Sequence, residues 1–296
     1  MHQELCPLIE QGPEGQRATF AYCANRFKDV YDSLPEDPQH LVTDFWKEKN
    51  AQLVAEWLPS PPYEFLRNSV IAWTMFVPYS KFTNGELATI RETFDDSEVV
   101  NLLSESHVGM PRTFGCGGVE SSGNTVHHLH HIARYSQITG NPVAASRIFE
   151  WGGGYGNMAK LYKRLWGYAT YTMVDTRMFS AIQWLYLSCV FGEGEVVLHT
   201  KKQDVVTGKI NIVPIGLVDE LECDTDMFVS TWAISESNDA CQKLLVDRGL
   251  YGAGRALIGH QGTSSAFPFA DAVKGLVGDA QSEPIDFLPG NWYLFK

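Results

Sequence analysis

The chain has 296 residues, of which 44% are hydrophobic and 12% are aromatic, and its formal net charge is -12. This composition excludes a disordered chain, and the length suffices for one large domain or for a main domain with an extension. No basic stripe interrupts the acidic excess, which argues against nucleic acid as a partner, because phosphate binding requires clustered lysine and arginine.

The amino terminus and the cysteines favour a cytoplasmic protein. Residues 1–5 show no basic stretch followed by an apolar one, so we expect no signal peptide. No uncharged apolar run approaches the length of a membrane span, so we expect no membrane partner. The six cysteines are scattered without a CxxC pair, which is typical of reduced thiols.

The first hundred residues are predicted to be mainly helical. An irregular lead-in is expected over 1–37, and helices are expected over 39–58, over 65–76 and from Glu86 onward. The proline-rich stretch 59–62 ends the first helix, and Asn84 is expected to cap the third. The spacing of Trp46, Trp57 and Trp73 is typical of residues in a helix core. The alternative interpretation is that these side chains form a platform for stacking a sugar.

Strands and helices alternate from about residue 143. Strands are expected over 147–151, 171–175, 210–215, 227–233, 256–261 and 292–295, with helices over 157–166, 181–191 and 239–247. This alternation implies right-handed crossovers and a parallel sheet, whose ligands bind beyond the carboxyl ends of the strands. The predicted fold class is therefore α/β, with a Rossmann-like sheet and helices on both faces over 141–296. A mainly helical extension over 1–140 is expected to form the acceptor pocket or lid, a dimer contact, or both.

The stretch 148–159, Ile-Phe-Glu-Trp-Gly-Gly-Gly-Tyr-Gly-Asn-Met-Ala, carries the strongest functional signal. An apolar run ends at Glu150, four glycines follow within five positions, and a helix-forming sequence begins at Asn157. This order indicates a strand, a tight turn and a helix whose free backbone N–H groups face a nucleotide-like ligand. Residues 154–159 also fit the dinucleotide pattern GxGxxA, with Asp175 near the spacing of a ribose-binding acid, so NAD is one interpretation. A glycine-rich turn without a ligand is another.

The same stretch resembles class I S-adenosylmethionine-dependent methyltransferases, because an acidic residue directly precedes the glycines. The resemblance implies that Glu150 lies near the methionine part of the donor and that Asp175 holds its ribose hydroxyls. A carboxylate at position 150 suits a ligand with an ammonium and a sulfonium and would repel a pyrophosphate, which favours S-adenosylmethionine over NAD. The predicted donor site comprises Glu150, Gly152, Gly153, Gly154, Gly156, Asn157, Asp175, Thr176, Thr231 and Trp232.

More specifically, the chain resembles the putative sugar O-methyltransferase family over roughly residues 105–261. The similar stretches are Phe-Glu-Trp-Gly-Gly-Gly-Tyr-Gly at 149–156, Tyr-Thr-Met-Val-Asp at 171–175 and Asp-Met-Phe-Val-Ser-Thr-Trp-Ala-Ile-Ser-Glu at 226–236. Members of that family carry Ile, Leu-Pro and Met where this chain has Trp151, Thr176-Arg177 and Ser237. The resemblance implies O-methylation of a sugar or sugar nucleotide.

A sugar hydroxyl is a poor nucleophile at neutral pH, so its methylation requires a general base. Glu236 is the first candidate because it follows the strand over 227–233 at the ligand edge of the sheet. Its alternative role is that of a carboxylate favoured at a helix N-terminus. His260, near the end of the strand over 256–261, is the second candidate, with a solvated loop histidine as the alternative.

Four of the nine histidines cluster at 127, 128, 130 and 131, on a helix that Asn124 is expected to cap. At i,i+4 spacing His127 and His131 would share the polar side, while His130 borders the apolar stripe. Such a pair can bind zinc, but the sequence offers no third ligand, so no metal site is predicted. His127 is the third candidate base, and a solvated face is the alternative.

The sequence thus predicts an S-adenosylmethionine-dependent O-methyltransferase whose acceptor is a small molecule, in the first place a carbohydrate. Three alternatives stay open. They are methylation of another small molecule at oxygen or nitrogen, NAD-dependent oxidoreduction, and a non-catalytic nucleotide-binding module.

Overall fold

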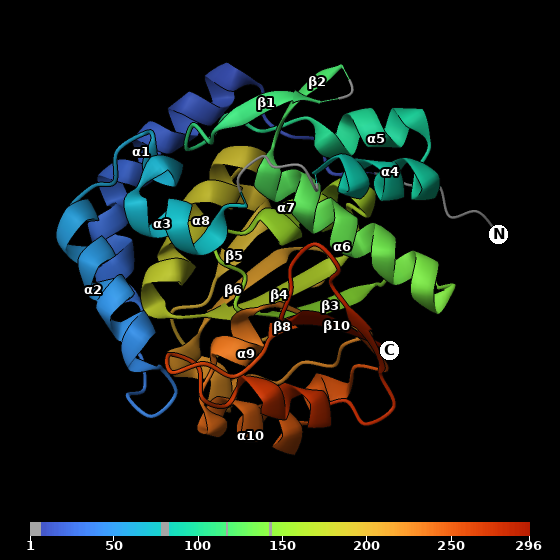
Figure 1. Cartoon of the computed structure of the whole chain (residues 1–296). Helices are drawn as coiled ribbons and strands as arrows, with labels where there is room; N and C mark the ends of the chain where they lie inside the picture. Colours follow the sequence, from blue (N-terminus) through green and yellow to red (C-terminus); the bar gives the residue numbers. More distant parts are fainter. Residues whose placement is uncertain (1–6, 78–82, 117, 142–143) are drawn as a thin grey trace.

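The computed structural model describes residues 7–77, 83–116, 118–141 and 144–296 (Figure 1). The start of the predicted lead-in, residues 1–6 with Cys6, lies outside the described residues. Within the described part an eight-stranded sheet has the strand order β5-β6-β4-β3-β7-β8-β10-β9. Its strands are β3 (Arg147–Trp151), β4 (Thr170–Asp175), β5 (Val196–Leu198), β6 (Ile210–Pro214), β7 (Met227–Thr231), β8 (Arg255–Gln261), β9 (Gln281–Pro284) and β10 (Asn291–Phe295).

The order of the strands defines where a ligand fits. Strands β5, β6, β4, β3, β7 and β8 are parallel, whereas β10 runs antiparallel to both β8 and β9. The chain enters the sheet at β3, fills one side with β4, β5 and β6, and then returns to fill the other side from β7. Sheets of this kind bind ligands at such a reversal, beyond the carboxyl ends of the two central strands.

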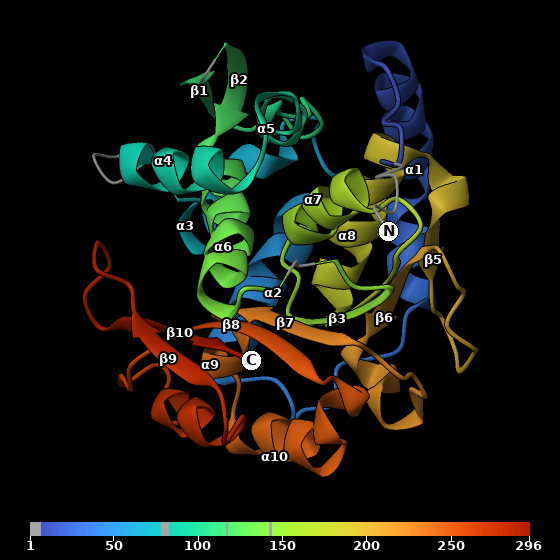
Figure 2. The same ribbon diagram turned by 90° about the vertical axis from the view of Figure 1, so that its right-hand side faces the viewer.

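Helices cover both faces of the sheet, as the predicted fold class requires. One face carries α6 (Gly123–Thr139), α7 (Asn157–Leu165) and α8 (Arg177–Phe191), and the other carries α9 (Ala233–Glu236) and α10 (Asp239–Asp247) (Figure 2). Neighbouring strand residues point to opposite faces, so Ile148 packs in the core under α7 and α8 while Phe149 packs in the core on the α10 side. Short 3-10 helices follow several elements, at Glu193–Glu195, Ile215–Glu220, Gly249–Gly252 and Ala270–Gly275.

The expectation of an irregular lead-in over 1–37 is wrong. Most of it is the helix α1 (Pro13–Ser33), with proline in the first turn, where no N–H partner is needed. This helix packs along α8, whose residues from Met178 to Phe191 are all buried. The Gln11 side chain fixes the start of α1 by donating hydrogen bonds to the carbonyls of Ser188 and Cys189, each at 2.9 Å.

The rest of the N-terminal part is helical apart from one hairpin. It contains α2 (Asp44–Trp57), a 3-10 turn (Phe65–Arg67), α3 (Ser69–Met75), α4 (Thr83–Thr93), α5 (Asp96–Leu103) and the strands β1 (Thr113–Cys116) and β2 (Val119–Ser122). The helix expected over 65–76 is divided because the side chain of Asn68 caps α3 by accepting from the Val70 N–H. Asn84 lies inside α4 and is not its cap. Ser122, not Asn124, caps α6 by accepting from the Thr125 N–H.

A buried ion pair joins the N-terminal part to the helix that follows the glycine loop. The Lys160 ammonium on α7 donates to Glu105 at 2.6 Å, and both side chains are buried. The same carboxylate accepts from the Ser122 N–H at 3.2 Å and from the Thr125 hydroxyl at 2.6 Å. Glu105 therefore ties the start of α6 to α7, and both helices border the site described below.

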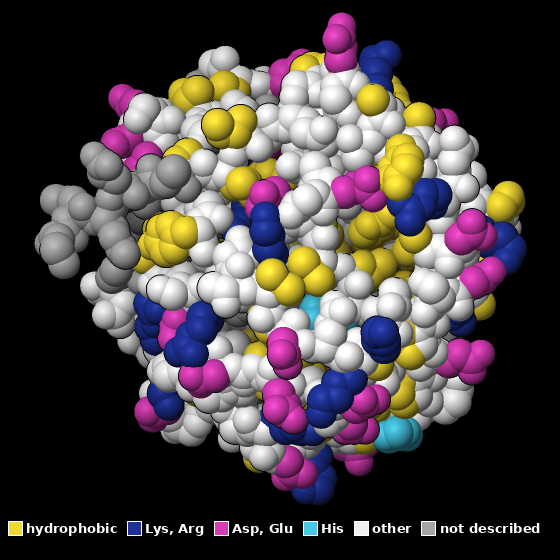
Figure 3. Space-filling view, turned by 180° about the vertical axis from the view of Figure 1, so that it is seen from behind, with side chains coloured by type: hydrophobic (Ala, Val, Ile, Leu, Met, Phe, Trp, Pro, Cys, Tyr) yellow, Lys and Arg dark blue, Asp and Glu magenta, His cyan; other side chains and the backbone are white. Residues whose placement is uncertain are grey.

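None of the described helices is long and apolar enough to cross a membrane. Acidic and basic side chains are interspersed over the back face of the molecule (Figure 3).

Candidate functional site

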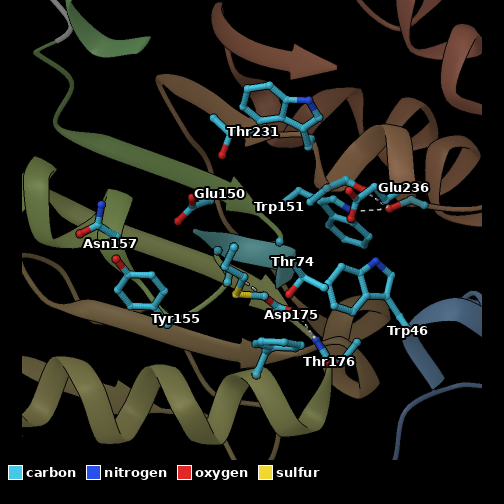
Figure 4. Close-up of a pocket in the computed structure, with 18 of the residues that line it drawn as sticks. Trp46, Thr74, Glu150, Trp151, Tyr155, Asn157, Asp175, Thr176, Thr231 and Glu236 are labelled. Atoms are coloured by element: carbon cyan, nitrogen blue, oxygen red, sulfur yellow. Dashed lines mark hydrogen bonds between the residues drawn. The ribbon is translucent and has the colours of Figure 1, made fainter. Parts of the chain in front are cut away.

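A cavity of about 320 Å³ opens at the carboxyl ends of β3, β4 and β7. Its floor is the glycine loop after β3, and its walls include residues of α2, α3, α6 and α9 (Figure 4). Ligand pockets of soluble proteins are typically of this size or larger. The cavity therefore lies where the strand order reverses, which is where the sequence places a ligand.

The glycine loop has the backbone that only glycine adopts easily. Gly152, Gly154 and Gly156 have φ values of 74°, 56° and 101°. A side chain at Gly152 would also overlap the methyl group of Ala233, and one at Gly153 would lie 2.9 Å from a carboxyl oxygen of Glu150. Gly152, Gly154 and Gly156 are therefore required by the turn itself, before any ligand is considered.

Glu150, the penultimate residue of β3, is a buried carboxyl group at the floor of the cavity. One of its oxygens accepts a hydrogen bond from the Tyr171 hydroxyl at 2.9 Å, and the side chain is 1% exposed. Burial is the main cause that raises the pKa of Glu150 to about 8; the nearby Asp175 contributes to this rise, and the hydrogen bond from Tyr171 opposes it. Among the described residues that line the cavity there is no lysine or arginine. The ionised form of Glu150 thus has no cationic partner among the described residues of the cavity wall.

Asp175 ends β4 beside the same loop. One carboxyl oxygen accepts from the Gly154 N–H at 3.1 Å and from the Gln183 amide at 2.9 Å, and the other accepts from the Thr176 N–H at 2.8 Å. Burial raises the pKa of Asp175 to about 7 despite these bonds. A carboxylate has about four lone-pair sites, so the group is oriented by the protein and keeps acceptor capacity for a ligand.

Glu236 lies at one end of the cavity, on α9. Burial raises the pKa of Glu236 to about 7, while a hydrogen bond with Trp46 lowers it. The neighbouring Ser237 hydroxyl accepts from the Trp151 indole at 2.9 Å. In the close-up, Glu236 and Trp46 lie at one end, Asn157 and Tyr155 lie at the other, and Glu150 lies between them (Figure 4).

His127 on α6 lines the cavity from the other side. Its ring stacks on Trp232, with centroids 5.5 Å apart, and its Nδ1 is hydrogen-bonded to the carboxyl group of Glu86 on α4. The neighbouring His128 also lines the cavity, and its Nδ1 is 3.2 Å from the Asn157 amide nitrogen. The α6 helix therefore approaches the Asn157 end of the cavity.

Trp232 has an unusual backbone for a residue with a side chain. Its φ is 67° and its ψ is -34°, at the junction of β7 and α9. The indole N–H donates to Asn291 at 2.7 Å, which holds the ring against His127. Such conformations concentrate at functional sites, because the surrounding structure must hold them against their strain.

The expectation that His127 and His131 share a polar face is wrong. Both are buried, because α6 is covered by α4 on one side and by β10 on another. The Nδ1 of His131 is 2.6 Å from the Tyr293 hydroxyl of β10. In the described part of the chain, no group of three or more histidine, cysteine or acidic side chains could hold a metal ion.

The predicted site residues separate into two groups by position. The cavity is lined by Glu150, Gly152, Gly153, Gly154, Asn157, Asp175, Thr176, Thr231, Trp232, Glu236 and His127. Gly156, the last glycine of the loop, does not line the cavity, and a side chain at this position would lie 2.9 Å from the side chain of Leu187. His260 does not line the cavity; it is buried in β8, and its ring stacks on Trp292 with centroids 5.6 Å apart.

Three features of the site are not among the site residues predicted from the sequence. Trp46 lines the cavity, although its spacing indicates a helix core, and residues 74–77, at the end of α3 and directly after it, line it as well. For Glu86, which is hydrogen-bonded to His127, the sequence contains one weak sign of burial. It is an acidic residue one helical turn before the buried Ile90, on the apolar side of α4.

No family model and no curated protein matches the chain. Among solved structures, it is similar to the pyocyanin biosynthetic protein PhzM, with 15% identity, a TM-score of 0.38, and coverage of 58% of this chain and 56% of that one. It is similar to the mitomycin 7-O-methyltransferase MmcR, with 9% identity, a TM-score of 0.37, and coverage of 58% and 56%. It is also similar to human N-acetylserotonin methyltransferase in complex with SAM, with 12% identity, a TM-score of 0.37, and coverage of 95% of this chain and 92% of that one. The chain thus spans little more than half the length of PhzM and MmcR, at 56% of each.

Proposed function

We propose that the protein is an S-adenosylmethionine-dependent methyltransferase that acts on a hydroxyl group of a small molecule. The observation that carries this proposal is the pair of buried carboxyl groups, Glu150 and Asp175, at the glycine loop of a cavity whose described lining contains no lysine or arginine. A ligand with a cationic end and a ribose satisfies both groups, because the cation replaces the missing partner of Glu150 and the ribose hydroxyls donate to Asp175.

The geometry of the loop argues against NAD. In dinucleotide-binding proteins, free N–H groups of the loop hold the pyrophosphate. Here the N–H groups of Gly152, Gly154 and Gly156 donate to Val174, Asp175 and Gly153 within the protein, at 2.8, 3.1 and 2.9 Å. A pyrophosphate would also approach two carboxyl groups without a compensating cation. These contacts favour the methyl donor.

Residues on three strand ends would hold the donor. Glu150, Gly152, Gly153 and Asn157 surround the amino acid part, Asp175 and Thr176 hold the ribose side, and Thr231 and Trp232 close the third side. When bound, S-adenosylmethionine supplies a methyl group on a sulfonium, and the protein's task is to bring a deprotonating acceptor in line with it. Glu236 and His127 both line the cavity, so either is placed to take the acceptor proton.

The acceptor is proposed to be an unphosphorylated sugar. The resemblance to putative sugar O-methyltransferases supports a sugar hydroxyl, whereas the absence of lysine and arginine from the described lining disfavours a nucleotide sugar. A second candidate is an aromatic hydroxyl compound, favoured by the rings of Phe76 and Trp232 in the wall. We also propose that residues 1–140 supply the acceptor side, since α3 and α6 contribute lining residues from that part.

Methyl transfer can be tested directly. The protein is incubated with S-adenosylmethionine and a panel of free sugars, nucleotide sugars and phenols, and products are searched by mass spectrometry for the gain of one methylene. Production of S-adenosylhomocysteine that depends on an acceptor supports the proposal, and its loss in Asp175→Ala ties it to this cavity. Donor binding without product from any acceptor would favour a non-catalytic binding module instead.

A further inference from the structure

The two candidate bases come from different elements around the cavity, α9 for Glu236 and α6 for His127. Glu236 is beside Trp46, at the end beyond Asp175 (Figure 4). His127 belongs to α6, whose next residue His128 contacts Asn157 at the opposite end. The group nearer the sulfur of the bound donor is the one placed to take the acceptor proton, so the orientation of the donor decides between them.

The two carboxyl groups fix that orientation, on the basis of the proposed function. In S-adenosylmethionine the sulfur joins the ribose to the amino acid part. A donor with its ribose at Asp175 and its cationic amino acid part at Glu150 therefore has its sulfur between those two contacts. Its adenine then lies beyond Asp175, at the Trp46 and Glu236 end. The reactive part lies on the Glu150 side, which α6 approaches.

Glu86 and His127 form a buried carboxylate–imidazole pair on that side. The contact joins a carboxyl oxygen of Glu86 to Nδ1 of His127, and the two side chains are 1% and 4% exposed. When Nδ1–H donates to the carboxylate, the other ring nitrogen, Nε2, carries the free lone pair. The ring is held by stacking on Trp232 and by an edge contact with His131, whose centroid is 4.2 Å away.

We propose that Glu86 is a positioning residue that holds His127 with Nε2 unprotonated, and that His127 rather than Glu236 takes the acceptor proton. In this step the acceptor oxygen forms a bond to the methyl carbon, and the carbon–sulfur bond breaks with its electron pair passing to sulfur. The hydroxyl proton moves to Nε2 of His127. The imidazolium that results keeps its Nδ1–H on the carboxylate of Glu86, which stabilises the new charge.

Burial shifts the pKa of both groups of the pair and keeps the imidazole uncharged. It lowers the pKa of His127 to about 3 and raises the pKa of Glu86 to about 7. The imidazole is therefore neutral before each turnover, and the adjacent carboxylate offsets part of the cost of charging it. The other titratable groups around the pair are His128, His130 and His131 on α6 and Tyr293 on β10.

The tautomer of His127 tests the pair without any acceptor. Protein labelled with ¹⁵N-histidine is studied by NMR at pH 8, and the signals of His127 are assigned by their absence in His127→Gln. We expect a neutral ring protonated at Nδ1 and bare at Nε2, with S-adenosylhomocysteine shifting the His127 signals. A ring protonated at Nε2 would overturn the proposal, even where the donor analogue binds. Failure of the analogue to bind wild-type protein would overturn the proposed function instead.

Kinetics separate positioning from a structural role, with any acceptor that the panel identifies. We expect His127→Gln to lower kcat by about 100-fold or more, and Glu86→Gln by about 10-fold or more, with KM changed by less than about 3-fold. Glu86→Asp should recover part of the loss, because it restores the charge. The matched control is Glu92→Gln, which makes the same change at an exposed position of α4 and should leave kcat unchanged.

Glu236→Gln gives the opposite signature. Because Glu236 lies at the adenosine end, this variant should weaken binding of S-adenosylhomocysteine and raise the KM for the donor more than it lowers kcat. Loss of kcat in Glu236→Gln together with wild-type kcat in Glu86→Gln would overturn the proposal and return the base role to Glu236.

Discussion

Replacing Glu150 with glutamine is expected to change how the stability of the ligand-free protein depends on pH. The carboxyl group is fully buried, and its pKa is raised from 4.5 to about 8. The folded protein therefore binds a proton that the unfolded chain has released, between about pH 4.5 and pH 8. This group therefore stabilises the fold most at low pH, and its contribution to the unfolding free energy falls as the pH rises through that window.

The magnitude comes from the same shift. Each pH unit inside the window costs the wild-type protein about 1.4 kcal/mol relative to a variant without the charge. Between pH 5 and pH 7 the unfolding free energy of Glu150→Gln should therefore gain about 2.7 kcal/mol on that of the wild type. The glutamine oxygen can still accept from Tyr171, and any cost of burying its amide nitrogen is the same at both pH values.

Urea denaturation at pH 5, 6 and 7 without ligand measures this difference. Glu222→Gln is the control, because its side chain is 84% exposed and the change should be equal at all three pH values. If the unfolding free energies of wild type and Glu150→Gln change with pH in parallel, Glu150 is not a buried carboxyl group that lacks a cationic partner in the ligand-free protein, and the reasoning is refuted. The same variant should bind S-adenosylhomocysteine more weakly, so stability and function oppose each other at this residue.

Two further predictions concern the frame of the site. Gly152→Ala should destabilise the protein by about 2–4 kcal/mol and impair binding of the donor analogue, because it forces a side chain onto a positive φ and into Ala233. Gly194→Ala, at a position where a side chain meets no other atom, is its control. Equal melting temperatures for the two variants would contradict the claim. Glu105→Gln should cost about 3–5 kcal/mol in urea denaturation, because it leaves the Lys160 ammonium buried without its partner. The double variant Glu105→Gln/Lys160→Met should recover much of that loss, and no recovery would show that the ion pair is not the cause.

The predictions from sequence succeed where the signal is local. The strand, glycine turn and helix at 147–165 follow from an apolar run, four glycines and a helix-forming segment that are contiguous in the chain. The parallel strands β4, β6, β7 and β8 are also found close to their expected positions, because each is a short apolar segment between helices. The α/β class follows from this alternation.

The remaining features depend on contacts between distant segments. Helix α1 has a mostly exposed, polar sequence, and the apolar surface that fixes it belongs to α8, more than a hundred residues later. The periodicity of α6 predicts a polar side for His127 and His131, whereas α4 and β10 cover this helix from two directions. The pairing of Glu86 with His127 spans 41 residues and two helices, so no periodicity could reveal it. The division of the chain near residue 140 and the dimer contact stay predictions.

Isothermal titration of the ligand-free protein with S-adenosylhomocysteine and with NAD tests the central claim most directly. A cavity built around Glu150 and Asp175 should bind S-adenosylhomocysteine and not NAD, and Asp175→Ala should abolish that binding while the protein stays folded. Binding should also release protons near pH 7, because a cation beside Glu150 lowers its raised pKa. Binding of NAD alone, or S-adenosylhomocysteine binding that Asp175→Ala leaves intact, would contradict the account.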